Sequence, residues 1–361
     1  MPTILPPAAF APVMLNAVAT AVPTHDIHDA FIEWARERVD PAARALFSRM
    51  ATRAQIGHRW SVFEPTATGG SPVATDGFYG NGFPGTAARM AIYAEAAPEL
   101  AVAAIETLGT QIVLDGITHL IVASCTGFVA PGIDQIIAAR LGLAPSVERL
   151  LVGFMGCYAA VAALRSARHV VRSDPAARVL VVTVELSTVH LRDETALEPL
   201  LAMLQFGDGA AAALVSSAPG GIELGQPFAT TLPDSAHLIR WAITDQGFAM
   251  HLSGEVPARI ATALSDPAFV ATITGGRTPA SLDWAVHAGG RSILDAVDHA
   301  LALPPSALAA SRAVLAENGN MSSATLMFVL ARMLRSPSRG GVALAFGPGL
   351  AAEGFAFGGS A

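Results

Sequence analysis

Short runs of apolar residues alternate with segments of helical periodicity along most of the chain. Five runs rich in Val, Ile, Leu and Ala are bounded by Gly, Pro or polar residues: 118–125, 178–186, 210–217, 283–289 and 341–349. Each run is too short and too uniformly apolar for a strand with one face in water. We therefore predict central strands that are buried on both faces.

Helical patterns lie between these predicted strands. Apolar residues recur at intervals of three and four in five segments: 98–108, 132–141, 158–172, 291–301 and 322–335. Strands that alternate with helices in this way indicate a layered α/β protein.

Two segments lack either periodicity. Residues 216–237 are rich in Gly, Pro and Ser and divide the chain near its middle, so we predict a linker between two similar halves, residues 1–220 and 221–361. Residues 63–85 are predicted to form a long loop insertion.

Composition narrows the class of protein. The mean hydropathy is +0.48, yet no uninterrupted apolar span reaches the roughly 18 to 20 residues that a bilayer requires. The N-terminus has no basic segment before its apolar part, so we expect a cytoplasmic protein without a signal peptide and without membrane contact. Two cysteines are too few for a disulfide framework or a cysteine-based metal site, and no metal is expected.

Charge excludes further classes. The net charge of −7 argues against a nucleic-acid partner. All 22 basic residues are arginine, so mechanisms that use a lysine Schiff base or a lysine base are impossible. Arginine is the only permanently cationic side chain left for binding phosphates.

Cys157 follows an apolar run and directly precedes an Ala-rich helical pattern. A thiol at a helix N-terminus has its thiolate stabilised by unpaired backbone N–H groups and by the helix dipole, so Cys157 is a candidate nucleophile with a lowered pKa. Free cysteines are also common as small core residues, and the local pattern alone leaves both interpretations open.

His287 and Asn320 are the candidates that could act with this thiol. His287 ends an apolar run and is followed by two glycines and a helical pattern, so its ring is expected to project into a crevice built by loops. Asn320 lies in a polar turn before the segment that starts near Ser322, where an N-cap is the ordinary alternative. Together a thiolate, an imidazole and a carboxamide would supply a nucleophile and two donors for an oxyanion.

Five motifs in the same order resemble the type III polyketide synthases, the chalcone synthase-like branch of the thiolase-fold condensing enzymes. They are GFMGCYAAVAALRSARHVV with ARVLVVTVELS, QFGDGAAAALV, WAVHAGGRSILDAV, GNMSSATLMFVL and VALAFGPGL, between residues 117 and 349. The resemblance implies a five-layered αβαβα fold with two similar halves that share one core. It also implies a homodimer, and the departures from plant sequences suggest a bacterial member.

The resemblance assigns a role to each candidate. Cys157, His287 and Asn320 match the catalytic cysteine, histidine and asparagine, and Phe206 matches a phenylalanine that guards the passage between the CoA tunnel and the cavity. Phe346 belongs to the glycine-rich loop behind the cavity. The implied reaction loads an acyl-CoA starter on the cysteine and extends it with malonyl-CoA, with loss of CO2, before cyclisation to a pyrone, resorcinol or phloroglucinol. No cofactor is expected beyond the CoA thioesters.

The resemblance also assigns residues to the cavity wall and the CoA site. The expected wall residues are Cys125, Ser187, His190, Trp241, Met250 and Ser322. Cys125 is expected to be a wall residue and not a second nucleophile, because it lacks a helix start. Trp241 stands where plant enzymes often have glycine, and Met250 replaces the second gatekeeper phenylalanine. His190 is expected to orient the chain or a water. Arg53 and Arg59 match the basic stretch that binds CoA phosphates, with solvated surface arginines as the alternative.

Two rival functions share parts of this pattern. A priming 3-oxoacyl-[acyl-carrier-protein] synthase also uses Cys, His and Asn but condenses only once. A thiolase-fold protein without catalysis could act as a binding partner, although the complete set of Cys157, His287 and Asn320 argues against it.

Overall fold

The computed structural model describes residues 11–358, and one nine-stranded sheet runs through it. Its strands are β1 (Met14–Ala21), β4 (His119–Ser124), β5 (Glu148–Gly153), β6 (Val179–Leu186), β7 (Asp208–Ser216), β8 (Ile222–Thr231), β11 (Asp283–Val286), β12 (Gly341–Gly347) and β13 (Ala351–Phe357). They lie in the order β11-β12-β13-β8-β1-β7-β6-β4-β5. Two small two-stranded sheets pair β2 (His25–Asp26) with β3 (Trp60–Ser61) and β9 (Ile239–Thr244) with β10 (Gly247–Leu252).

The same pairing pattern occurs twice in the large sheet. In the first half β4 is parallel to β6, which is antiparallel to β7, which is antiparallel to β1. In the second half β11, β12, β13 and β8 repeat this sequence of contacts. The two units join through a short pairing of β1 with β8, and only the first unit has an additional outer strand, β5.

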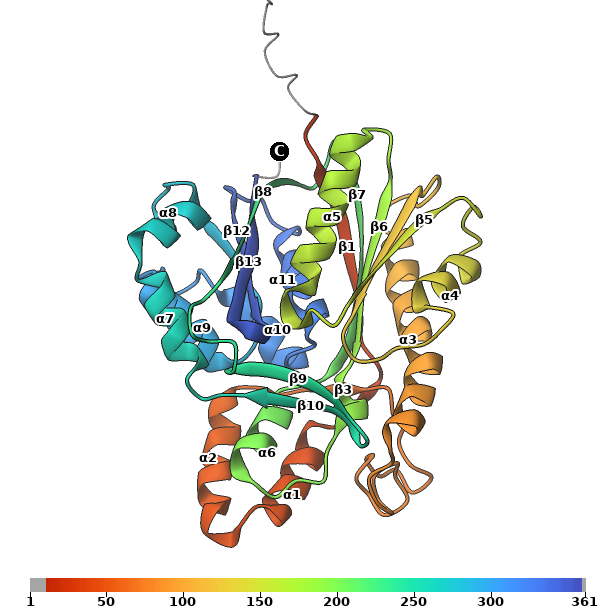
Figure 1. Cartoon of the computed structure of the whole chain (residues 1–361), viewed down its shortest axis with the longest axis vertical. Coiled ribbons are helices and arrows are strands. Elements are labelled where there is room, and N and C mark those ends of the chain that lie inside the picture. Colours follow the sequence, from red (N-terminus) through yellow and green to blue (C-terminus); the bar gives the residue numbers. More distant parts are fainter. Residues whose placement is uncertain (1–10, 359–361) are drawn as a thin grey trace, which may run out of the picture.

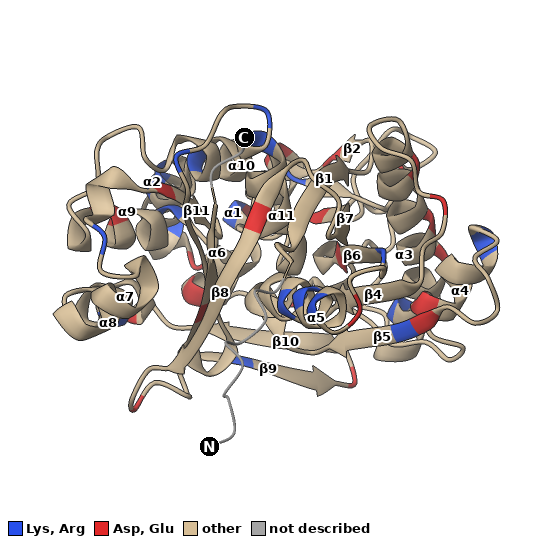
Figure 2. Ribbon diagram, turned by 90° about the horizontal axis from the view of Figure 1, so that it is seen from above, with Lys and Arg blue, Asp and Glu red and all other residues tan. Residues whose placement is uncertain are grey.

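The helices complete five layers, seen from right to left in Figure 1. The α-helices are α1 (His28–Arg38), α2 (Arg44–Ala54), α3 (Thr86–Gly109), α4 (Ile133–Arg140), α5 (Ala159–Ser173), α6 (Leu197–Met203), α7 (Val256–Leu264), α8 (Pro267–Thr274), α9 (Arg291–Ala300), α10 (Ala309–Asn318) and α11 (Ser323–Met333). Helices α3 and α4 cover one outer face, α5 and α11 fill the middle, and α7 to α9 lie on the other outer side. Figure 2 shows β8 crossing between the middle helices and α7, α8 and α9. The layered thiolase-like fold predicted from the sequence is confirmed.

Alternation within the strands explains why the central layer is buried on both faces. In β4, Leu120 and Val122 pack toward α3, whereas Ile121 and Ala123 belong to the cluster around α5 and α11. Successive side chains of a strand point to opposite faces, and here both faces are covered by helices. The uniformly apolar runs therefore form central strands, as predicted.

Two predictions about the chain's organisation require correction. The segment 216–237 is not a linker, because it contains the ten-residue strand β8, which pairs with both β13 and β1. Its Gly and Pro residues concealed the strand from a composition-based reading. The helix predicted from residue 98 begins twelve residues earlier, at Thr86, and carries Pro98 in its interior. The predicted loop 63–85 has no helix or strand.

Candidate active site

Cys157 lies in a 3-10 turn, Gly156–Tyr158, between β5 and α5. Helix α5 begins only at Ala159, after the cysteine. Two glycines shape this turn. Gly156 has φ of +70°, and a Cβ on it would lie 2.4 Å from Cδ of Pro348. A Cβ on Gly347 would lie 2.6 Å from Cδ1 of Tyr158, so the glycine-rich loop after β12 packs directly against the turn that carries the thiol.

Asn320 and Ser322 approach the thiol from the second half of the chain. Cys157 Sγ lies 4.0 Å from Ser322 Oγ, and the Asn320 carboxamide also interacts with the thiol. Ser322 is the N-cap of α11 with φ of +46°, and its backbone N–H donates to Asn320 Oδ1 at 2.8 Å. This bond and a second one from Thr325 Oγ1 bind the Oδ1 atom of Asn320 within its own turn, whereas Nδ2 is available to other segments.

His287 directly follows β11 and is linked to Asn320 through Gly289. Asn320 Nδ2 donates to the Gly289 carbonyl at 3.2 Å, and Gly289 N–H donates to the His287 carbonyl at 2.9 Å. The imidazole is 1% exposed, and neither ring nitrogen has a hydrogen-bond partner. The structure therefore places Asn320 next to Cys157 and links Asn320 to His287 through Gly289, and both nitrogens of this histidine are free for other groups.

Burial governs the charge of the cluster. It raises the pKa of the Cys157 thiol to about 12, while the hydrogen bonds from Ser322 and Asn320 act in the opposite direction. Burial lowers the pKa of His287 to about 3. Each group taken singly is thus neutral, and the prediction that a helix N-terminus lowers the thiol pKa is corrected. The physical reason is that desolvation of a buried thiolate outweighs a helix that begins two residues later.

Cys125 is a second buried thiol, next to the turn that carries Cys157. Its Sγ accepts a hydrogen bond from Gly156 N–H at 2.9 Å, and its backbone N–H donates to Glu185 Oε2 at 2.9 Å. Glu185 also accepts hydrogen bonds from Thr126 and from Ser323 of α11, and burial raises its pKa to about 7. This buried carboxyl group, which sequence reasoning missed, ties the two halves together beneath the catalytic turn.

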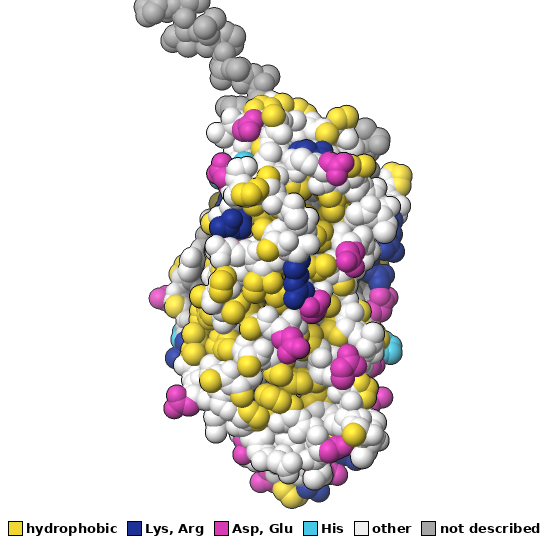
Figure 3. All heavy atoms as spheres, turned by 90° about the vertical axis from the view of Figure 1, so that its right-hand side faces the viewer, with side chains coloured by type: hydrophobic (Ala, Val, Ile, Leu, Met, Phe, Trp, Pro, Cys, Tyr) yellow, Lys and Arg dark blue, Asp and Glu magenta, His cyan; other side chains and the backbone are white. Residues whose placement is uncertain are grey.

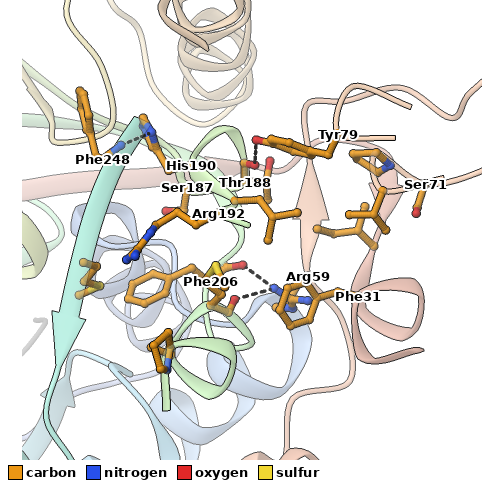
Figure 4. Close-up of a pocket in the computed structure, with 18 of the residues that line it drawn as sticks. Phe31, Arg59, Ser71, Tyr79, Ser187, Thr188, His190, Arg192, Phe206 and Phe248 are labelled. Carbon is orange, nitrogen blue, oxygen red and sulfur yellow. Dashed lines mark hydrogen bonds between the residues drawn. The ribbon is translucent and has the colours of Figure 1, made fainter. Parts of the chain in front are cut away.

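A pocket beside the catalytic cluster collects most of the predicted cavity residues (Figure 4). It encloses about 80 Å³, several times the roughly 10 to 15 Å³ that one water needs. Phe206, Ser187, His190, Trp241 and Met250 line it, whereas Cys125, Ser322 and Phe346 do not. Phe206 also forms a backbone bridge with Asn320, so the pocket borders the catalytic cluster. Phe346 is 3% exposed in the second-half core.

His190 contributes a wall to this pocket but no free polar atom. Its Nε2 bonds to the Thr126 carbonyl at 2.7 Å, and its Nδ1 accepts from Phe248 N–H at 3.0 Å. Burial lowers the pKa of His190 to about 4, so the ring is neutral. The predicted role in orienting a chain or water is corrected, because Nε2 is bound to Thr126 and Nδ1 to Phe248 of β10.

Arg59 is not at the protein surface, which corrects its predicted contact with CoA phosphates. The side chain is 2% exposed, and its Nη1 donates to the carbonyls of Met203 and Phe206 at 3.0 and 2.9 Å. A Cβ on Gly319 would lie 3.0 Å from Arg59 Cγ, so the arginine packs against the turn that carries Asn320. Arg53, by contrast, is exposed at the end of α2, where its carbonyl accepts from Arg291 Nη1 at 3.1 Å.

Comparison with known proteins agrees with this architecture. Residues 8–219 match the N-terminal domain of the chalcone and stilbene synthases, and residues 223–359 match their C-terminal domain. The chain belongs to this family. It is a type III polyketide synthase, an acyltransferase, as the sequence motifs predicted.

Individual relatives support the same assignment. The chain is 36% identical over 295 residues to bisdemethoxycurcumin synthase of Oryza sativa subsp. japonica, covering 75% of this chain and 73% of the relative. The structure resembles PKS-I of the brown alga Ectocarpus siliculosus with a TM-score of 0.88 and 26% identity, over 98% of this chain and 100% of that one. It also shares its fold with the C-terminal type III domain of Steely1 from Dictyostelium, with a TM-score of 0.86 and 24% identity, over 97% and 100% of the two chains.

Two further observations concern metal ions and membrane-spanning helices. No set of three or more His, Cys, Asp or Glu side chains in residues 11–358 is arranged to hold a metal ion. Within the same range, no helix is long and apolar enough to span a membrane.

Proposed function

We propose that this polyketide synthase loads an acyl-CoA starter on Cys157 and extends it repeatedly with malonyl-CoA. The observation that carries the proposal is the approach of Asn320 and Ser322 from the second half to Cys157 from the first. Asn320 is linked through Gly289 to His287, whose two ring nitrogens are free. Such a cluster provides a nucleophile, a base and amide donors without a further cofactor.

Proton transfer within the pair activates the thiol. A thiolate or an imidazolium alone is disfavoured by burial, but moving the proton from Cys157 to His287 creates two opposite charges that stabilise each other. Cys157 Sγ then attacks the starter carbonyl, and the departing CoA sulfur takes the proton from His287. The products of this step are the Cys157 thioester and free CoA.

Condensation uses the amide and imidazole as donors. Malonyl-CoA loses CO2, and the electron pair of the broken C–C bond forms the enolate of acetyl-CoA. One Asn320 Nδ2 proton is engaged with Gly289, which leaves the second for the enolate oxygen alongside a His287 N–H. The enolate carbon attacks the Cys157 thioester and releases the thiolate, so the chain grows by two carbons.

We propose that Arg53 and Arg291 bind the CoA phosphates in place of Arg59. Arg291 is the first residue of α9, four positions after His287, and it contacts Arg53. Its ion pair with Asp295 at 3.3 Å is partly exposed, and such pairs contribute at most about 1 kcal/mol, so a phosphate can displace the carboxylate.

A truncated substrate tests this assignment. Arg291→Gln and Arg53→Gln are expected to raise KM for malonyl-CoA about tenfold while leaving turnover of malonyl N-acetylcysteamine, which lacks the phosphates, unchanged. Arg140→Gln on α4 is the matched surface control. Equal effects on both substrates would contradict a phosphate contact.

Products identify the extension chemistry. Incubation with malonyl-CoA and a panel of acyl-CoA starters should yield pyrones, resorcinols or phloroglucinols containing several malonate units, detected by mass spectrometry. A strict requirement for malonyl-carrier protein and a single condensation would instead support the priming-synthase alternative. Absence of malonyl decarboxylation would support a non-catalytic partner.

We also propose a homodimer that forms across β5. This strand ends the large sheet, so one backbone edge is unpaired, and Leu150 and Leu151 on it are 45% and 42% exposed. Phe128 beside it is 45% exposed, and Figure 3 shows hydrophobic side chains gathered across the middle of the face on this side. A second copy can extend the sheet and cover these side chains. Light scattering should report a dimer that Leu151→Arg dissociates.

We retain the proposal of two halves, residues 1–220 and 221–361, because the strand pairings of β1, β4, β6 and β7 recur in β8, β11, β12 and β13. Both cysteines are free thiols, which supports the proposed cytoplasmic location.

A further inference from the structure

Three buried donors without partners line the pocket of Figure 4. The described residues with an unpaired buried polar atom are Arg59 (Nη2), Arg89 (Nη2), Thr183 (Oγ1), Ser187 (Oγ), Trp241 (Nε1) and His287 (both ring nitrogens). Of these, Arg59, Ser187 and Trp241 line the pocket. An unsatisfied buried polar group destabilises the folded protein, so three such groups on residues of one pocket wall indicate a ligand with acceptor oxygens.

The positive charge of Arg59 favours a ligand in which one acceptor oxygen is anionic. Its Nη1 bonds to two backbone carbonyls, its Nε bonds to His28 Nδ1 at 3.0 Å, and Cζ lies 4.5 Å over the Phe31 ring. Burial and the neighbouring Arg59 lower the pKa of His28 to about 4, so this partner is neutral as well. No carboxylate within residues 11–358 forms an ion pair with the guanidinium, and Asp26 and Asp208 act on its charge only from beyond ion-pair distance.

The acidic groups nearest to Arg59 have other partners. Asp26 accepts hydrogen bonds from the backbone of His28 and Arg59 and from the His58 ring. Asp208 accepts from Val62 and Thr188, and burial raises its pKa to about 6. Arg192 adds a second cation to the pocket wall, 3.5 Å from Glu194. The polar part of the pocket wall therefore contains two arginines and no carboxylate.

The remaining wall selects an apolar body. Side chains without polar atoms form most of it, including Ile27, Phe31, Val73, Phe206, Phe248 and Met250. A suitable ligand combines a hydrophobic chain or ring with at least one anionic oxygen and one further acceptor.

We propose that this pocket binds the enolate of a 1,3-dicarbonyl unit, with an anionic oxygen on Arg59 Nη2 and the second oxygen on Trp241 Nε1 or Ser187 Oγ. The inference rests on the proposed function, because successive condensations create 1,3-dicarbonyl units in the growing chain. On binding, the proton of the carbon between the carbonyls is released to solvent, and its electron pair is delocalised over both oxygens. A charge-assisted hydrogen bond from Nη2 is stronger to an anionic oxygen than to a neutral one. Arg59 thereby determines which dicarbonyl unit of the chain is ionised.

A binding experiment without turnover tests this proposal. The intact protein is titrated with 1-phenylbutane-1,3-dione between pH 6.5 and 8.5, and the enolate is followed by its absorbance. Bound probe is expected to ionise at least one pH unit below free probe. At pH 8, 1-phenylbutan-1-one, which has one carbonyl and no acidic proton of this kind, should bind at least tenfold more weakly.

Variants assign the effect to individual donors. Arg59→Met should abolish the shift in ionisation, Arg59→Lys should retain part of it, and Trp241→Phe should weaken binding a few-fold and reduce the shift less than Arg59→Met does. Arg140→Met is the matched surface control. Because Arg59 also binds two carbonyls, the two-probe comparison on the unaltered protein stands if Arg59→Met does not fold.

Two outcomes would overturn the proposal. One is ionisation of the bound probe at the pH of the free probe, and the other is equal affinity for the two probes. Neither result depends on Cys157, so failure here is distinguishable from failure of the proposed condensation, which is measured as product.

Discussion

The two halves of the chain place different chemistry at equivalent positions. Cys125 follows β4 as His287 follows β11, and Cys157 precedes the middle-layer helix α5 as Asn320 precedes α11. The strand-end position is structural in the first half, where Cys125 Sγ is occupied by Gly156 N–H, and open in the second, where both His287 nitrogens are free. The repeat therefore supplies a scaffold, and side-chain partners decide which copy of each position reacts.

Replacing each cysteine separately by alanine should give the largest difference between two of these positions. We expect Cys157→Ala to reduce product formation more than about a thousandfold, because the covalent intermediate is lost. Cys125→Ala should reduce it less than about tenfold, since this thiol exchanges hydrogen bonds only with the backbone of Gly156. Mass spectrometry of products measures both. Unchanged decarboxylation and product formation in Cys157→Ala would refute the nucleophile assignment.

Asn320 tests the corresponding helix start of the second half. Removal of one preorganised oxyanion donor costs on the order of a hundred- to a thousandfold in rate. We expect Asn320→Ala to slow malonyl-CoA decarboxylation by that factor, with acylation of Cys157 changed far less. CO2 release and intact-protein mass report the two steps separately. A loss of acylation as large as the loss of decarboxylation would contradict this division of roles.

His287 tests the open strand end through the pH dependence of thiol alkylation. Burial raises the pKa of Cys157, and the proposed transfer of its proton to His287 would oppose this rise. His287→Ala should therefore shift the alkylation profile of Cys157 upward by about two pH units, which lowers the iodoacetamide rate at pH 7 about a hundredfold. The measurement uses a Cys125→Ala background, and an unmoved profile would exclude a Cys–His pair.

Glu185 tests how the contact between the halves affects stability, because it joins Cys125 of the first half to Ser323 of the second. Burial raises its folded pKa from the ordinary 4.5 to about 7. Between these values the unfolded chain releases the proton and the folded protein keeps it, so the free energy of unfolding falls as pH rises from 4.5 to 7 and levels off above.

Glu185→Gln should remove this slope, which amounts to at most roughly 3 kcal/mol. Urea unfolding at pH 5 and pH 8 measures it, and Glu106→Gln, exposed on α3, is the control. A slope that survives in Glu185→Gln would assign it to other groups.

The sequence by itself indicated five of the central strands, five of the helices and the catalytic candidates, and the resemblance implied the layering. Doubly buried strands appear as uniformly apolar runs, and Cys157, His287 and Asn320 stand at strand ends and helix starts that the periodicity reveals. These features depend on neighbours along the chain. The strand β8 was not predicted, because its Gly and Pro residues are typical of loops and its pairing partners lie far away in sequence.

Only the tertiary structure decided the state of individual polar groups. Arg59 looked like a surface cation, yet it is buried against the carbonyls of Met203 and Phe206, more than 140 residues away. His190 looked available for a ligand, yet segments 126 and 248 occupy both its nitrogens. Burial and hydrogen-bond partners set charge and reactivity, and both come from residues that are distant in sequence and close only in the folded protein.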